Sequence, residues 1–158
     1  MRRLAAPLML LLLAAAPTSA ADALARVCSD PEHPCSIFKP HDLSFPLPTD
    51  GKPRGEVKSA PFYAVILRTV ERCRLDEKER LAAQALFPRN KAFATRFECD
   101  DDVENNVTYT GVDAKHGFLA VYAGETQPAA RAFLAEVKRT GKFPGANLRK
   151  MQVVVAVD

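Results

Sequence analysis

Apolar residues are concentrated in four short segments of the chain, and the longer segments between them are more polar. The four short segments are rich in β-branched and aromatic residues, which is typical of strands. We therefore predict strands at residues 62–67 (FYAVIL), 91–98 (KAFATRFE), 118–123 (FLAVYA) and 150–157 (KMQVVVAV). The stretch between the second and third strands is a polar loop, in which the residues VTYT can extend a hairpin.

A first helix is predicted between the first two strands. Asp76, with Glu79 three residues later, matches a helix N-cap and its reciprocal partner, and Pro88 ends the run. The apolar residues of this segment recur with the period of an amphipathic helix. The apolar residues that share one face of it are Leu81, Ala82, Ala85 and Leu86.

A second helix is predicted after the third strand. Thr126 can cap it, Pro128 is tolerated in its first turn, and Gly141 follows it as a C′ residue. Lys138 and Arg139 lie in its last turn, where positive charge is favourable. The apolar residues that share one face of it are Ala130, Phe133, Leu134 and Val137.

The order of the predicted elements is strand, helix, strand, strand, helix, strand. That order predicts an α+β fold, a β-α-β-β-α-β sandwich of ferredoxin-like type with a four-stranded antiparallel sheet and two helices on one face. The first and third strands both begin Phe-x-Ala-Val, at 62–65 and 118–121. We interpret them as the first strands of two corresponding strand–helix–strand halves.

Residues 1–20 are typical of a secretory signal peptide. Arg2 and Arg3 precede an apolar core, and small residues follow it, which predicts cleavage after Ala20 or, alternatively, after Ala23. The apolar run is shorter than the roughly 20 residues of a membrane span, and an uncleaved anchor is the alternative interpretation. We expect a periplasmic or secreted bacterial protein without a stable membrane span.

Residues 21–60 form a proline-rich segment before the predicted domain of residues 61–158. Seven of the 12 prolines lie between Pro31 and Pro61. Because proline fixes φ and lacks an N–H donor, we expect an irregular or extended arm that can drape over the domain. Beyond the signal peptide, 20 basic and 19 acidic side chains remain, a balance that gives no support to nucleic-acid binding.

The chain has four cysteines, Cys28, Cys35, Cys73 and Cys99. An exported protein with an even number of cysteines usually pairs them, here in one of three connectivities. We favour Cys28–Cys35, which closes a small loop, and Cys73–Cys99, which joins positions just after the first two strands at one edge of the sheet. A zinc site is the alternative, but no Cys-x-x-Cys pair is present, and we expect neither a metal nor a cofactor.

The segment FLAVYAGETQPAARAFLAEVKRTGKFPGANL resembles the sporulation-related repeat (SPOR) family. Members of that family share the predicted topology and have a strand that ends Val-x-Val-Gly before an alanine-rich helix. Val121, Ala123 and Gly124 match that strand end, and the resemblance is clearest over residues 118–148. The resemblance implies binding of peptidoglycan glycan strands, stripped of stem peptides, through the exposed face of the sheet.

The first half of the domain departs from the family pattern. Ile66 stands where the family has glutamine, and Arg68 stands where it has glycine. Matching the strands to the family turns five side chains toward the helices: Val65, Leu67, Leu119, Val121 and Ala123. It places seven on the exposed face: Phe62, Ala64, Ile66, Arg68, Phe118, Ala120 and Tyr122.

The resemblance therefore implies a set of candidate glycan-binding residues: Phe62, Ile66, Arg68, Phe118 and Tyr122. Aromatic rings can stack on the apolar faces of sugars, and arginine can donate several hydrogen bonds to glycan oxygens or carboxylates. Gln152 and Arg96 are further candidates. The alternative is structural, with Phe62 and Phe118 packed beneath the arm or the long loop, because exposed aromatic patches are normally covered or used.

No pattern of a catalytic site is present. The three histidines, His33, His41 and His116, have no neighbouring nucleophile, and no Gly-x-Ser-x-Gly motif occurs. The acidic run CDDDVE lacks the spacing of an EF-hand, so we interpret it as a solvated loop and not as a calcium site. We predict a non-enzymatic glycan-binding domain. The alternatives are a periplasmic protein-binding adaptor or inhibitor-like module and, with least support, a small hydrolase.

Overall fold

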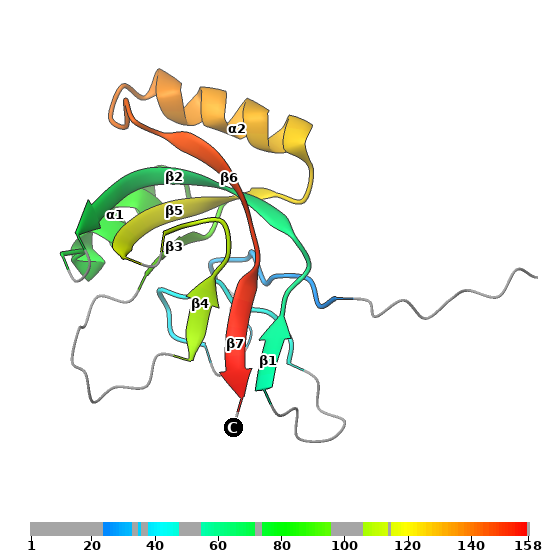
Figure 1. Cartoon of the computed structure of the whole chain (residues 1–158). Helices are drawn as coiled ribbons and strands as arrows, with labels where there is room; N and C mark the ends of the chain where they lie inside the picture. Colours follow the sequence, from blue (N-terminus) through cyan, green and yellow to red (C-terminus); the bar gives the residue numbers. More distant parts are fainter. Residues whose placement is uncertain are drawn as a thin grey trace, which may run out of the picture.

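The computed structural model describes residues 24–32, 35, 38–47, 55–71, 74–95, 106–113 and 115–157. Its elements, in chain order, are β1 (Gly55–Lys58), β2 (Phe62–Glu71), α1 (Glu77–Leu86), β3 (Ala92–Ala94), β4 (Val107–Tyr109), β5 (His116–Gly124), α2 (Gln127–Arg139), β6 (Asn147–Met151) and β7 (Val153–Val157). Figure 1 shows their arrangement.

The central layer is a four-stranded antiparallel sheet in the order β3-β5-β2-β6. Both helices pack on the same face of this sheet and enclose a first hydrophobic core (Figure 1). The predicted ferredoxin-like α+β fold is therefore confirmed. The five side chains predicted to face the helices all belong to this core: Val65, Leu67, Leu119, Val121 and Ala123.

The two copies of Phe-x-Ala-Val lie side by side, because β2 and β5 are the central strands of the sheet. Val65 is opposite Val121, and Ala64 is opposite Tyr122. Gly124 ends β5 with a φ of +103°, a conformation that glycine adopts without a steric penalty. The repeated phrase therefore corresponds to the central pair of strands.

A second antiparallel sheet, in the order β1-β7-β4, was not predicted. The single strand expected at residues 150–157 is two strands, β6 and β7, which separate at Gln152 and belong to different sheets. The backbone N–H of Gln152 donates to Thr110 Oγ1 at 2.8 Å, and its Nε2 donates to Ser59 O at 2.9 Å. These bonds fix the point at which the chain leaves one sheet for the other (Figure 1).

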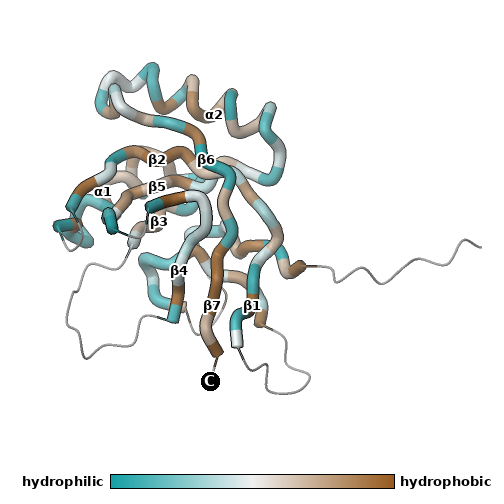
Figure 2. Tube along the Cα trace, in the orientation of Figure 1, coloured by the Kyte–Doolittle hydropathy of each residue, from teal (hydrophilic) through white to brown (hydrophobic). Residues whose placement is uncertain are grey.

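The second sheet and part of the arm together cover the face of the four-stranded sheet that points away from the helices. Figure 2 shows apolar residues in β2, β5 and β7. Side chains from these three strands belong to a second hydrophobic core between the two sheets. Leu43 and Phe45 of the arm are fully buried in this second core. The exposed face that the family resemblance implies is therefore covered. The structural alternative is the one observed, because Phe62 and Phe118 are buried together with residues of the arm.

Helix α1 presents a different face to the sheet than its periodicity indicates. Asp76 is its N-cap and accepts from Lys78 N at 2.9 Å, as predicted. Its buried residues are Arg80 and Ala83, whereas Leu81 and Leu86 are 52% and 38% exposed. Arg80 can be buried because its Nε donates to Glu77 Oε2 at 2.9 Å and its Nη1 donates to Ala92 O at 3.3 Å. A paired arginine thus occupies a position that the apolar pattern assigns to solvent.

Helix α2 packs as predicted. Ala130, Phe133 and Val137 are buried, and Leu134 is partly buried against the first core. Thr126 is the N-cap residue, although its side chain makes no capping hydrogen bond. Gly141 follows the helix with a φ of +67°, as expected of a C′ glycine.

The arm is joined to the domain near its disulfide. Cys28 and Cys35 form the predicted disulfide, with their Cα atoms 5.8 Å apart. Cys28 N donates to Ser44 O at 2.6 Å, and Cys35 N donates to Ser44 Oγ at 3.2 Å. The disulfide therefore lies beside the segment that carries Leu43 and Phe45 into the second core. Cys73 and Cys99, the other predicted pair, lie outside the described residues.

Candidate functional site

The structure separates the five residues predicted to bind a glycan. Phe62, Ile66 and Phe118 are 1%, 3% and 2% exposed and belong to the second core, so none of them forms an open stacking platform. Tyr122 is half-buried, with its ring 5.8 Å from that of Phe62. Burial raises the pKa of the Tyr122 hydroxyl, and the nearby Glu125 carboxylate adds to this effect.

Arg68 lies on the helix side of the sheet, and its predicted position on the other face was wrong. The pairing of β2 with β5 shifts register between Ile66 and Arg68, as at a β-bulge, so that Leu67 and Arg68 are directed to the same side. Arg68 Nη1 donates to Glu79 Oε2 of α1 at 2.7 Å. Of the two further candidates, Gln152 lies at the bend between β6 and β7, where its side chain donates to Ser59 O. Arg96 lies outside the described residues.

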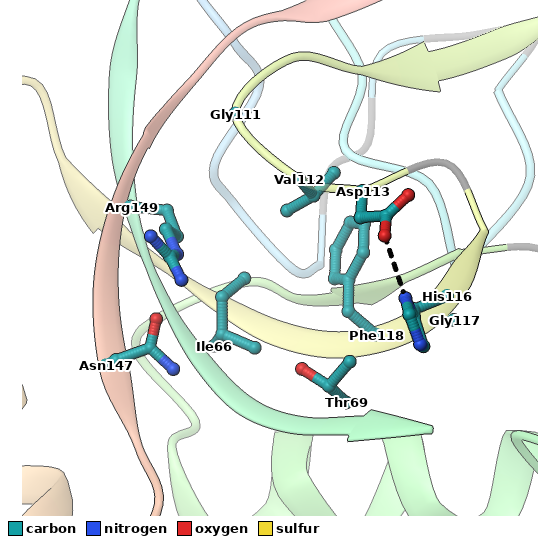
Figure 3. Close-up of a pocket in the computed structure, with 10 residues that line it drawn as sticks. All are labelled: Ile66, Thr69, Gly111, Val112, Asp113, His116, Gly117, Phe118, Asn147 and Arg149. Carbon is teal, nitrogen blue, oxygen red and sulfur yellow. Dashed lines mark hydrogen bonds and ion pairs between the residues drawn. The ribbon is translucent and has the colours of Figure 1, made fainter. Parts of the chain in front are cut away.

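On the face of the four-stranded sheet that points away from the helices, one part remains accessible as a cleft of about 330 Å³ (Figure 3). Ile66 and Phe118 lie at the floor of the cleft between its two sides and expose little of their side chains there. Asn147 and Arg149 of β6 lie on one side, and the loop that carries Asp113 lies on the other. The remaining lining residues are Thr69, Gly111, Val112, His116 and Gly117. The accessible lining of the cleft is therefore mainly polar, with hydrogen-bonding groups on both sides.

The β6 side of the cleft is positioned by its pairing with β2. Asn147 is opposite Ile66, and Arg149 is opposite Ala64, so both side chains are directed to the same sheet face. Arg149 is exposed and makes no ion pair with any residue in the described part of the chain. Asn147 Nδ2 donates to Gly145 O at 3.3 Å, while its Oδ1 is buried and accepts no hydrogen bond from the described residues. This side therefore offers a guanidinium and a buried acceptor.

The opposite side of the cleft carries an exposed carboxylate–histidine pair. Asp113 Oδ1 accepts from Lys115 N at 2.9 Å, and its Oδ2 lies 3.1 Å from His116 Nδ1. The hydrogen bond from Lys115 N, supported by His116, lowers the pKa of Asp113 below its ordinary value. Asp113 is therefore ionised at neutral pH, and the cleft has a negative group facing a positive one (Figure 3).

A glycine allows the loop of Asp113 to lie close to β6. Gly111 has a φ of +78°, and a Cβ atom at this position would collide with the backbone carbonyl oxygen of Lys150. The loop is also joined to the bend at Gln152, because Thr110 N donates to Gln152 O at 3.0 Å. The width of the cleft therefore depends on the backbone of Gly111.

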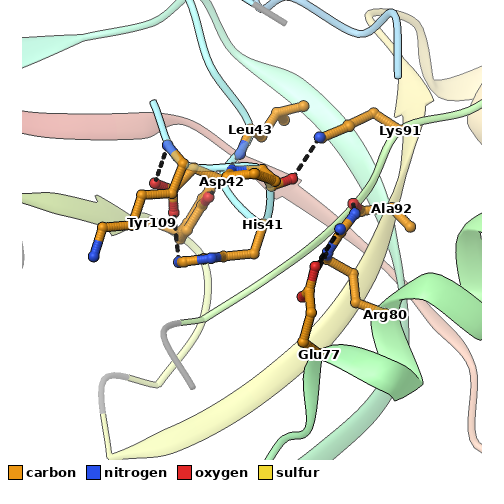
Figure 4. Close-up of polar contacts among 10 residues, drawn as sticks. His41, Asp42, Leu43, Glu77, Arg80, Lys91, Ala92 and Tyr109 are labelled. Carbon is orange, nitrogen blue, oxygen red and sulfur yellow. Dashed lines mark hydrogen bonds and ion pairs between the residues drawn. The ribbon is translucent and has the colours of Figure 1, made fainter. Parts of the chain in front are cut away.

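A second polar cluster, away from the cleft, fixes the arm to the edge of the four-stranded sheet (Figure 4). Ala94 N of the edge strand β3 donates to His41 O at 3.0 Å, and Lys91 Nζ donates to Pro40 O at 2.6 Å. Leu43 N donates to the hydroxyl of Tyr109 at 3.0 Å. These bonds satisfy buried polar groups and cover an edge strand, so the cluster has a structural explanation.

The pKa values of this cluster are displaced by its burial. Burial lowers the pKa of Lys91, an effect that the Arg80 charge reinforces. Burial also raises the pKa of Asp42, although the neighbouring His41 opposes that shift. The pKa of the Tyr109 hydroxyl is raised well above its ordinary value by burial.

We expect His41 to make the fold sensitive to acid. Burial lowers its pKa, and the Asp42 and Glu77 carboxylates only partly offset this effect. Below about pH 6.5 the unfolded chain is protonated at this histidine, whereas the folded chain takes up the proton less readily. The free energy of unfolding therefore falls as the pH falls. Urea unfolding at pH 7.5 and 5.5 should show a smaller loss of stability for His41→Asn than for the parent. Equal losses would contradict this prediction.

Most of the cleft residues could not be recognised from the sequence. Ile66 and Phe118 were named as binding residues, but Asn147, Arg149, Asp113 and His116 match no motif. Within the described ranges, no group of three or more His, Cys, Asp or Glu side chains is arranged to hold a metal ion. Among the same residues, no helix is long and apolar enough to cross a membrane.

Comparison of the chain with models of protein families, with curated proteins and with solved structures gives no match.

Proposed function

We propose that this chain is an exported bacterial binding domain that holds a peptidoglycan glycan strand in the cleft between β6 and the Asp113 loop. The observation that supports this most is the placement of hydrogen-bonding groups on both sides of the cleft, with Asn147 and Arg149 on one side and Asp113 on the other. Sugar rings carry hydroxyl groups around their edge, so one ring can form hydrogen bonds with both sides of the cleft at once. The disulfide is consistent with an oxidising compartment outside the cytoplasm.

The two sides of the cleft suit different groups of an acidic amino sugar. The Arg149 guanidinium can bind a carboxylate in a bidentate manner. The buried Oδ1 of Asn147 can accept from a hydroxyl or an acetamido N–H, which would relieve an unsatisfied polar atom. Asp113 can accept from sugar hydroxyls on the opposite side. No residue of the cleft needs to act as a nucleophile in this proposal.

Co-sedimentation with purified sacculi, before and after amidase removal of the stem peptides, tests the proposal. Arg149→Ala should weaken binding by about ten- to a hundredfold, since a hydrogen bond to a charged group contributes about 1.5–3 kcal/mol. Lys150→Ala is the matched control, because it removes the same charge from the next residue of the same strand, which points to the other side. The glycan proposal fails if the parent remains in the supernatant with both preparations, or if the two variants lose binding equally.

A further inference from the structure

The outer face of α1 and the groove beside it form an apolar surface that the fold does not use. Leu81 and Leu86 are two of the three large apolar side chains that are exposed in the described part of the chain. Ala82 and Ala85 lie between them on the same side of the helix and are also exposed. The predicted apolar face of this helix is therefore present, but it points to solvent.

A groove of about 610 Å³ continues this surface toward the loop after α2. Leu86 and Ala82 line it from the helix, and Phe143 and Pro144 line it from the loop. Leu67 and other residues of the sheet lie between them. The exposed leucines and the groove thus form one continuous apolar surface, which we call the α1 surface.

Basic side chains surround the α1 surface. Lys78 lies on the helical face, three residues before Leu81, and Lys142 lines the groove, whereas Arg89 is exposed in the turn that follows the helix. None of these three cations forms an ion pair among the described residues. The acidic group in the groove, Glu79, is already paired with Arg68 at 2.7 Å. The unpaired side-chain charge around the apolar surface is therefore mainly positive, with the N-cap Asp76 as the exception.

We propose that the α1 surface binds an acidic amphipathic helix of another protein. An apolar face supplies leucine-type anchors for the groove, and acidic flanks meet the three unpaired cations, as in helix-in-groove recognition. A second copy of the chain is a poorer occupant, because pairing this surface with itself would bring cations of like charge together. This site is separate from the cleft, so the inference does not depend on glycan binding.

Fluorescence anisotropy with two synthetic probes tests this proposal. Both are amphipathic helices of about 18 residues with leucine on one face, and they differ in having glutamate or lysine on the other. The acidic probe should bind the full chain saturably and at least tenfold more tightly than the basic probe. The double variant Leu81→Ser/Leu86→Ser should lose at least tenfold of this affinity, and Lys142→Ala should lose a smaller part that diminishes with added salt.

Leu24→Ser is the matched control, since Leu24 is the third exposed leucine and belongs to the arm. It should leave the affinity unchanged, and circular dichroism should show that all variants fold. Three results would overturn the proposal: equal binding of the two probes, no binding of either, or equal losses for the control and the double variant. A concentration-dependent dimer that the double variant abolishes would assign the surface to a second copy instead.

Discussion

Phe62→Ala should lower the free energy of unfolding by about 3–5 kcal/mol, the range for a large aromatic residue removed from a core. Phe62 is 1% exposed, and its ring lies 6.2 Å from that of Phe93 and 5.8 Å from that of Tyr122. Its removal leaves a cavity between the two sheets that these rings cannot fill without leaving their own contacts. Urea unfolding, followed by far-ultraviolet circular dichroism, measures the change.

A more conservative change separates packing from ligand binding at this position. Phe62→Leu keeps most of the apolar volume, so the loss of stability should be clearly smaller than for alanine. It also removes the aromatic ring that the family resemblance implies for sugar stacking. If Phe62→Leu stays folded and keeps the parent's affinity for sacculi, the ring is structural. A stable Phe62→Ala variant with weakened binding would contradict the buried position.

The helix-facing half of the fold could be predicted because one physical rule governs it. Alternation along a strand directs Val65 and Leu67 to one side, and the element order places both helices on that side. The repeated Phe-x-Ala-Val marks the first strand of each half, and the structure pairs these two strands at the centre of the sheet. The alternation of apolar residues and the order of the elements can both be read directly along the chain, without knowledge of its long-range contacts.

The second sheet could not be read from the same rules. β4 has three residues, β1 has mostly exposed side chains, and β7 follows β6 after a single residue. The sequence nevertheless indicates that both faces of the central strands are buried, because the segments FYAVIL and FLAVYA are apolar at successive positions and not only at alternate ones. A continuous apolar run is typical of a strand that is buried on both faces. An exposed binding face would require polar residues at every second position.

The face of α1 was mispredicted because burial there depends on pairing and not on hydropathy. Arg80 has a buried guanidinium whose hydrogen bonds go to Glu77 and to the backbone of Ala92. Ala92 is twelve residues away and belongs to another element, so no window of sequence reveals this acceptor. The cleft was missed for a similar reason, since Asn147 and Asp113 lie far apart in the sequence and are brought together by strand pairing and by the bend at Gln152.

Gly111→Ala should lower the free energy of unfolding by about 3 kcal/mol or more, because two penalties act together. The φ of +78° costs a residue with a side chain about 1–2 kcal/mol. The added methyl group also meets the carbonyl oxygen of Lys150, which is backbone and is held in the sheet. The loop must therefore move away from β6, which separates Asp113 from Arg149 across the cleft.

Gly141→Ala is the matched control for this substitution. Gly141 has a similar φ of +67°, but no heavy atom lies within 4 Å of the position that a Cβ would take. It should cost only the conformational penalty of about 1–2 kcal/mol, so the difference between the two variants isolates the collision with Lys150. Urea unfolding of both variants measures this difference. Equal losses would show that the loop yields without strain, and the backbone of Gly111 would then not set the width of the cleft.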